Sequence, residues 1–233
     1  MFTMREERYI RNGTCVTEKE QERLAQCKIV VIGCGGLGGY LIEMLARIGI
    51  GSLRVVDGDV FSTSNWNRQL LSEEGNLGEN KALEAKKRVE RINKKVQVEA
   101  VARFMEADQI ESLLEGCDLV LDGLDNLSTR KMLQQKCKEL QLPYVYGAIA
   151  GWYGQIALIL PDCPWSEVLF GGKQEKGEEE KVGNPSFTPA IVAGIQVSEA
   201  IKYLLGKVEE KHNYFLQLDL LSNELEKIIF EKP

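Results

Sequence analysis

Four charged side chains, Asp57, Arg68, Lys81 and Asp125, have the residue types that chemistry at a phosphate requires. Arginine and lysine neutralise negative charge on phosphate oxygens, and a single carboxylate can hold Mg²⁺ together with phosphate oxygens and waters. Hydride transfer to a nicotinamide would instead call for an acid–base residue, most often histidine. The sole histidine, His212, stands in a polar turn and is expected at the surface. Phosphate chemistry is therefore favoured over an NAD-dependent reaction.

A glycine-rich segment supplies the rest of a nucleotide site. The pattern G-x-G-x-x-G runs from Gly33 to Gly38, between a β-branched run and apolar residues at helical spacing. Such glycines allow a tight turn and close backbone approach, and the helix N-terminus offers free N–H groups to a phosphate. Asp57 ends the next predicted strand, where an acid accepts from a ribose hydroxyl. We expect four glycines to contribute to this site: Gly33, Gly35, Gly36 and Gly38.

The elements that must position these residues alternate between strand and helix up to residue 148. Apolar periodicity predicts strands at 28–32, 53–56, 96–101, 118–121 and 144–148, and helices at 17–26, 37–48, 80–92, 107–114 and 126–140. This alternation predicts a parallel sheet with right-handed crossovers. Asp57 and Asp125 each follow a strand, so both are expected at the carboxyl edge of the sheet, where such folds bind ligands.

The pattern changes after residue 150. Residues 151–160 predict a strand that follows its neighbour without a helix, 187–205 a long apolar helix, and 214–219 with 224–230 an antiparallel hairpin. The charged segment 173–184 cannot bury itself and is expected to be a mobile loop. The predicted fold is a single α/β domain with a Rossmann-like, mostly parallel sheet, helices on both faces and antiparallel C-terminal strands.

Composition argues against several classes of protein. The net charge of −6 disfavours a nucleic-acid partner, which usually calls for a basic face. No apolar run reaches about 18 residues and the N-terminus is too charged for a signal peptide, so we expect a cytoplasmic protein without a membrane association. None of the six cysteines forms a Cys-x-x-Cys pair, which argues against structural zinc. Several cysteines lie in apolar patterns and are expected to be buried and inert.

These motifs resemble the ThiF, MoeB and HesA family, bacterial relatives of the ubiquitin-activating enzymes. The Ser-Asn-x-x-Arg-Gln loop, joined to a later Lys and Asp-Asn, is far more specific than the glycine pattern. The resemblance covers nearly the whole chain and is carried by Arg8-Tyr9-Ile10-Arg11, the glycine segment, Asp57-Gly58-Asp59, Ser64-Asn65-Trp66-Asn67-Arg68-Gln69, Gly78-Glu79-Asn80-Lys81, Asp125-Asn126, Gly147-Ala148, Gly151-Trp152-Tyr153-Gly154-Gln155 and Glu199-Ala200-Ile201-Lys202.

The resemblance implies an adenylyltransferase that uses ATP and Mg²⁺. Its substrate would be the C-terminal glycine carboxylate of a ubiquitin-like sulfur carrier protein (ThiS- or MoaD-like) with a Gly-Gly end, and pyrophosphate would be released. Such sulfur transfer would serve the biosynthesis of a cofactor, thiamine or molybdopterin. By resemblance Asp57 holds the ribose, Lys81 stabilises developing charge and Asp125 binds Mg²⁺. Asn65 and Arg68 reach the phosphates, and the same site is expected to include Asp59, Ser64, Gln69 and Asn126.

The resemblance also implies a division of the chain and a homodimer. The expected parts are an N-terminal helical arm (1–26), a nucleotide-binding part (27–150) and a carrier-binding part (151–233), in which the mobile loop 173–184 covers the carrier's tail. Arg11 matches an arginine that family members supply across the dimer interface to the partner's ATP.

Two departures from the family pattern concern cysteines. Where many members begin a zinc site with Cys-x-x-Cys, this chain has Cys163-Pro164-Trp165-Ser166 and no second pair, so zinc is expected to be absent. No cysteine follows Cys163, so we expect no covalent thioester at the crossover loop and transfer of the adenylate to a separate sulfur donor.

Two alternatives stay open at this stage. One is adenylation of a different substrate, such as a tRNA base or a peptide; the other is an NAD-dependent Rossmann oxidoreductase.

Overall fold

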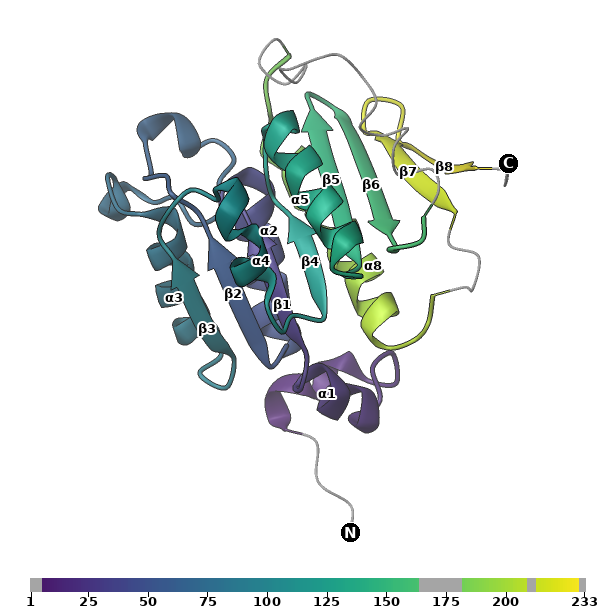
Figure 1. Ribbon diagram of the computed structural model, residues 1–233. Helices are drawn as coiled ribbons and strands as arrows, with labels where there is room; N and C mark the ends of the chain where they lie inside the picture. Colours follow the sequence, from purple (N-terminus) through teal and green to yellow (C-terminus); the bar gives the residue numbers. More distant parts are fainter. Residues whose placement is uncertain (1–5, 164–181, 209–212, 231–233) are drawn as a thin grey trace.

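A computed structural model describes residues 6–163, 182–208 and 213–230 around one eight-stranded sheet. The strand order is β3-β2-β1-β4-β5-β6-β7-β8 (Figure 1). Five strands pair in parallel: β1 (Lys28–Ile32), β2 (Ser52–Val56), β3 (Gln97–Val101), β4 (Leu119–Asp122) and β5 (Tyr144–Ala150). Three more add antiparallel to β5: β6 (Tyr153–Ile159), β7 (Tyr214–Asp219) and β8 (Glu224–Ile229). The predicted fold class is confirmed.

Helices cover both faces of the parallel strands. Within the described residues the α-helices are α1 (Glu18–Leu24), α2 (Gly36–Ile48), α3 (Lys81–Ile92), α4 (Ile110–Leu114), α5 (Leu127–Glu139) and α8 (Phe187–Leu204). Short 3₁₀ turns are η1 (Glu7–Asn12), η2 (Thr63–Asn65), η3 (Glu74–Asn76) and η4 (Ala107–Gln109). In Figure 1, α4 and α5 lie in front of the sheet, and α2 and α8 lie behind it.

Alternate residues of each strand pack into two separate cores. In β1, Ile29 and Val31 join the core that includes α2, α3 and α8, whereas Val30 and Ile32 join the core that includes α4 and α5. All four side chains are at most 1% exposed. A strand buried on both faces reads as a continuous apolar run, which is why β1 could be predicted as a strand but not oriented.

The bounds of the strands and helices agree closely with those predicted from the sequence. The predicted helix at 107–114 begins as the 3₁₀ turn η4 and continues as α4. Most of the predicted mobile loop (173–181) and His212 lie outside the described residues. No helix within the described ranges is long and apolar enough to cross a lipid bilayer.

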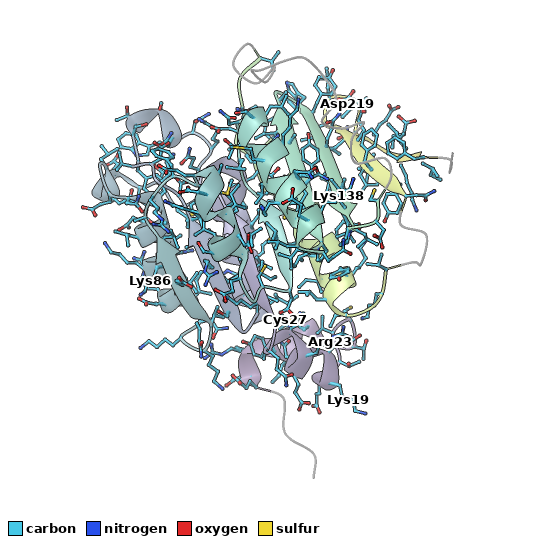
Figure 2. All side chains as sticks on the ribbon, viewed as in Figure 1. Lys19, Arg23, Cys27, Lys86, Lys138 and Asp219 are labelled. Carbon is cyan, nitrogen blue, oxygen red and sulfur yellow. The ribbon has the colours of Figure 1, made fainter. Side chains whose placement is uncertain are left out.

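The cysteines are free thiols, and five of the six are buried. Burial raises the pKa of Cys117 to about 11 and the pKa of Cys34 well above its usual range, so neither thiol ionises at neutral pH. Cys27 lies beside Arg23 at the end of the molecule that α1 closes (Figure 2), and its Sγ is 3.2 Å from the Arg23 carbonyl oxygen. These thiols have the character of packing residues.

The sheet has a topological switch point between β1 and β4. The chain leaves β1 for α2 and β2 on one side, and leaves β4 for α5 and β5 on the other. The two departing loops diverge at the carboxyl ends of these neighbouring strands, which opens a crevice there.

Candidate active site

A cavity of about 700 Å³ lies at the carboxyl ends of the parallel strands. Loops that follow β1, β2, β3 and β4 contribute to its lining, together with the segment that precedes α8. The structure brings ten of the residues expected from the sequence into this lining: Gly33, Gly35, Gly36, Asp57, Asp59, Arg68, Gln69, Lys81, Asp125 and Asn126.

The glycine loop is shaped by two glycines with different tasks. Gly33 has φ +92°, and a Cβ there would lie 2.6 Å from the carbonyl oxygen of Gly123. A Cβ on Gly38 would lie 1.8 Å from the carbonyl oxygen of Gly33. Gly38 is therefore needed where α2 meets the loop and does not line the cavity, whereas Gly33 permits both the left-handed backbone and contact with the loop after β4.

Asp57 fastens the glycine loop to the end of β2. Its Oδ2 accepts a hydrogen bond from the backbone N–H of Cys34 (2.7 Å) and its Oδ1 one from Asp59 (2.8 Å). Burial raises the pKa of the Asp57 carboxyl, although both backbone donors and the Lys81 charge oppose that shift. The Asp57 carboxylate, which lines the cavity, thus holds the glycine loop in position.

Lys81 is a buried cation in the cavity wall. It is 6% exposed, and its Nζ donates to Asp59 Oδ2 at 2.9 Å, while the Asp59 side chain is 58% exposed. Asn80 sets the position of this lysine: its Oδ1 accepts from the N–H groups of Ala82 and Leu83, which caps α3. Its Nδ2 donates to the carbonyl oxygens of Asp57 and Asp59, so the start of α3 is tied to the end of β2.

The loop between β2 and α3 is closed at its base by backbone hydrogen bonds. Phe61 donates to Glu79 (3.0 Å) and accepts from Gly78 (2.9 Å), and Lys81 donates to Asp59 (3.0 Å). The intervening residues 62–77 form η2, η3 and the turns between them.

Arg68 and Gln69 project from this loop into the cavity lining. Arg68 Nη1 donates to the Ser64 carbonyl oxygen (3.0 Å) and to Asn67 Oδ1 (2.9 Å), which leaves other guanidinium N–H groups for a ligand. Gln69 is 7% exposed, and its Oε1 is buried without a hydrogen-bond partner among the described residues. An unsatisfied buried oxygen in a cavity wall is suited to a polar ligand.

Ser64 and Asn65 precede Arg68 in the same loop. Asn65 is 8% exposed, and its Oδ1 accepts from the Ser62 N–H (3.0 Å), so its side chain holds the turn of η2. The Ser64 hydroxyl is 2.9 Å from that of Ser62. Neither residue lines the cavity. The phosphate contact expected of Asn65 stays a prediction.

Asp125 is the exposed carboxylate of the loop after β4. The next residue, Asn126, caps α5: its Oδ1 accepts from the Thr129 N–H (3.1 Å) and the Ser128 hydroxyl (2.6 Å). Asn126, and not Asp125, therefore caps this helix, and Asp125 has no hydrogen bond or ion pair to any described residue. It offers its oxygens to the cavity.

Asp122 lies beneath this loop and is fully buried. Its Oδ2 accepts from the Tyr144 hydroxyl (2.6 Å) and lies 3.1 Å from Arg130 Nε, and its Oδ1 accepts from the Leu124 N–H (2.8 Å). Burial raises the pKa of the Asp122 carboxyl, whereas Arg130 and the donated hydrogen bonds oppose that shift. Because Arg130 lines the cavity, this buried pair forms part of its floor.

Several lining residues were not expected from the sequence: Arg103, Phe104, Met105, Arg130, Gly183 and Asn184. The first three directly follow β3, so their place at the carboxyl edge could have been inferred as it was for Asp57. Phe104 is 65% exposed and lies against Gly58. Gly183 and Asn184 precede α8 at the end of the loop predicted at 173–184, and no motif marked either residue for the nucleotide.

Arg11 lies apart from the other expected residues. It is exposed at the end of η1, in the arm before α1, and does not line the cavity of its own chain. Zinc was expected to be absent; among the described residues no three His, Cys, Asp or Glu side chains gather as a metal site.

The chain belongs to the ThiF family, whose model matches residues 9–233. The SAMP-activating enzyme E1 of Haloferax volcanii is 35% identical over 211 residues, which cover 89% of this chain and 78% of that protein. The sulfur carrier protein adenylyltransferase of Thermus thermophilus is 33% identical over 217 residues, with 89% and 80% covered. The resemblance read from the motifs is confirmed.

Solved structures show the same fold at lower identity. Escherichia coli MccB, in its structure with MccA-N7isoASN, superposes with a TM-score of 0.84 and 18% identity, over 99% of this chain and 74% of that chain.

Proposed function

We propose that this protein adenylates the C-terminal glycine carboxylate of a ubiquitin-like sulfur carrier protein, with ATP as the second substrate. The observation that carries the proposal is the cavity itself. It combines a glycine loop at a helix N-terminus, the buried cation Lys81 and the carboxylate Asp125, which has no partner among the described residues, at one sheet edge. The family and the name of the Thermus thermophilus relative support the same reaction.

The residues of the cavity fit a nucleoside triphosphate with Mg²⁺. The first turn of α2 offers backbone N–H groups to phosphate oxygens, and Arg68, Lys81 and Arg103 provide positive charge along the wall. Asp57 lies at the end of β2, where a carboxylate accepts from a ribose hydroxyl. Asp125, exposed and without a described partner, is the residue that would hold Mg²⁺, which neutralises phosphate charge when bound.

In the proposed reaction, a carboxylate oxygen of the carrier attacks the α-phosphorus of ATP. A bond forms between that oxygen and phosphorus, and the bond from the α-phosphorus to the bridging oxygen breaks, so pyrophosphate leaves with the electron pair. Lys81 and Arg68 stabilise the charge that develops on the phosphate oxygens. The rest of the catalysis is positioning, because phosphoryl transfer asks for little covalent chemistry from the protein.

The carrier-binding role of residues 151–233 is part of the same proposal. Asn184 and Gly183 already reach the cavity lining from this part of the chain. Asn67 Nδ2 donates to the Asn184 carbonyl oxygen (3.1 Å), which joins the loop between β2 and α3 to the segment before α8. A carrier tail that passes this junction would meet the cavity between Arg68 and Asn184. The adenylate would then pass to a separate sulfur donor.

The exposure of Arg11 supports a homodimer in which it serves the partner's site. It lies outside its own chain's cavity, so a contribution to catalysis would have to be made to a second copy. Mixing an Arg11→Ala chain with an Asp125→Ala chain would then restore exchange in part, because each mixed dimer keeps one intact site.

The test of the function is carrier-dependent exchange of pyrophosphate into ATP. Wild type is compared with Asp125→Ala and with Asp108→Ala, an exposed aspartate outside the cavity. We expect Mg²⁺-dependent exchange that requires a Gly-Gly-ending carrier, that is lost in Asp125→Ala and that is retained in Asp108→Ala. ATP binding without exchange for any such carrier would refute the substrate, and the carrier that supports exchange would identify the pathway.

A further inference from the structure

The loop that carries Asp125 is held at Leu124, whose backbone N–H and carbonyl oxygen are both hydrogen-bonded. The N–H of Leu124 donates to Asp122 Oδ1 (2.8 Å), and the carbonyl oxygen of Leu124 accepts from Arg130 Nη2. Both backbone polar groups of the residue before Asp125 are thus bound by the same buried ion pair. The direction in which the Asp125 side chain leaves the backbone depends on that pair.

The pair is itself fixed by two other elements of the fold, β5 and α8. Arg130 Nη2 also donates to the Gly147 carbonyl oxygen of β5 (2.8 Å), and the Tyr144 hydroxyl holds Asp122 Oδ2. From α8, Gln196 Nε2 donates to the Asp122 carbonyl oxygen (2.9 Å). The side chain of Arg130 is 7% exposed and that of Asp122 is fully buried, so neither side chain has room to move away.

We infer that Arg130 and Asp122 are positioning residues that aim Asp125 at the metal of the adenylation reaction, an inference that rests on the proposed function. A buried ion pair contributes little to stability by itself, because desolvation offsets its attraction. A contribution to stability therefore explains the presence of this ion pair poorly, whereas its hydrogen bonds to Leu124 give it a specific role in positioning the loop. Partners that orient a metal ligand typically change metal affinity by about 10-fold to 100-fold when replaced.

Arg130→Lys is the variant that tests this inference. Lysine keeps the charge beside Asp122 but lacks the planar fork that reaches the carbonyl oxygens of Leu124 and Gly147. Tyr144→Phe is the matched control, because it removes a hydrogen bond to the same carboxylate and leaves both bonds to Leu124 in place. A purely structural pair would respond similarly to both changes.

Four measurements separate positioning from stability. Mn²⁺ binding to the protein with a non-hydrolysable ATP analogue is followed by electron paramagnetic resonance, and the affinity for the analogue is measured without metal. Pyrophosphate exchange is titrated with Mg²⁺, and the melting temperature is recorded. We expect Arg130→Lys to raise the Mn²⁺ dissociation constant and the half-saturating Mg²⁺ concentration about 10-fold or more. Affinity for the analogue without metal should stay within about twofold of wild type. Tyr144→Phe should lower the melting temperature and leave both metal constants unchanged.

The inference is overturned if Arg130→Lys lowers the melting temperature with metal constants like those of wild type. It is also overturned if Tyr144→Phe shifts the metal constants as far as Arg130→Lys does. If Arg130→Lys does not fold, Asp122→Glu, which keeps the charge and displaces the carboxylate, takes its place with the same expectations. Failure of the proposed function shows separately, as Mn²⁺ and nucleotide binding by wild type without carrier-dependent exchange.

Discussion

The loops after β2 and β4 share one local hydrogen-bonding pattern and differ in the groups that stabilise the charge of the inner aspartate. In each, an inner aspartate accepts from the N–H two residues on: Asp57 from Asp59, and Asp122 from Leu124. In each, an outer aspartate, Asp59 or Asp125, is exposed toward the cavity. The negative charge of Asp57 is stabilised by two backbone N–H donors and the charge of Lys81, whereas that of Asp122 is in direct contact with Arg130.

The outer aspartates also differ in what they bind. Asp59 holds Lys81, so the first loop presents a cation whose charge is already partly balanced. Asp125 has no described partner, so the second loop presents a carboxylate that is available to a metal. Two similar turns thereby place opposite kinds of ligand on the two sides of the β1 glycine loop.

The largest effect is expected for Lys81, the cation that Asp59 of the first loop binds. Lys81→Ala should lower the rate of pyrophosphate exchange by about 10²–10³, because it removes a charge that stabilises the transition state in a water-poor wall. Lys87→Ala on the same helix is the control, since Lys87 is exposed and pairs with Glu84. Similar rates for the two variants would show that the Lys81–Asp59 pair is structural.

The next largest effect is a difference in stability between substitutions of the two inner aspartates, Asp57 and Asp122, measured by chemical denaturation. Asp122→Asn leaves Arg130 buried opposite a neutral amide and should lower the free energy of unfolding by about 3–5 kcal/mol. Asp57→Asn keeps an acceptor for one backbone N–H and should cost about 1–2 kcal/mol. Equal losses would mean that the contact with Arg130 does not distinguish the loops.

The smallest effect concerns the pH dependence of stability. Burial raises the pKa of Asp57 and Asp122 above 3.8, so their contribution to stability is present below that pH and is lost as the pH rises through the folded pKa. Glu20 behaves oppositely. Hydrogen bonds from Lys207 and then Thr17 lower its pKa from 4.5 to about 2, so its contribution is present above pH 4.5 and is lost as the pH falls toward 2.

The free energy of unfolding should therefore fall less between pH 5 and pH 2 for Glu20→Gln than for wild type. Glu22→Gln, an exposed residue of the same helix, should keep the wild-type slope. A slope that both substitutions leave unchanged would exclude Glu20 as a source of acid sensitivity.

The sequence was sufficient for the strands, the helices and the residues that follow strand ends. Asp57, Lys81 and Asp125 could be predicted because short local patterns placed each of them beside an element boundary. Arg130 could not: it is one charged residue in a helix with few apolar positions, and nothing local indicates that it faces the sheet. Its role arises from contacts with β4 and β5 that only the tertiary structure creates.

Asn65 illustrates what a motif leaves open. Its amide oxygen accepts from the Ser62 N–H and its side chain is buried. A phosphate accepts hydrogen bonds, so it would be bound by the amide NH₂ group and not by this oxygen, and the phosphate contact stays a prediction. Residue type and spacing identify the loop, but the use of a side-chain amide to hold a turn or to contact a ligand depends on backbone geometry, which a motif does not encode.

The hydrogen bonds that close the loop between β2 and α3 have a consequence for evolution and for engineering. Backbone hydrogen bonds among Phe61, Gly78 and Glu79 close its base, and Asn80 anchors α3 directly to the end of β2, so the position of Lys81 is set there. The buried Leu71 and Asn76 hold the outer part of the loop, and only the exposed residues 73–75 between them can gain length while the lysine keeps its place. Variation there offers a way to diversify the protein's outer surface at constant chemistry.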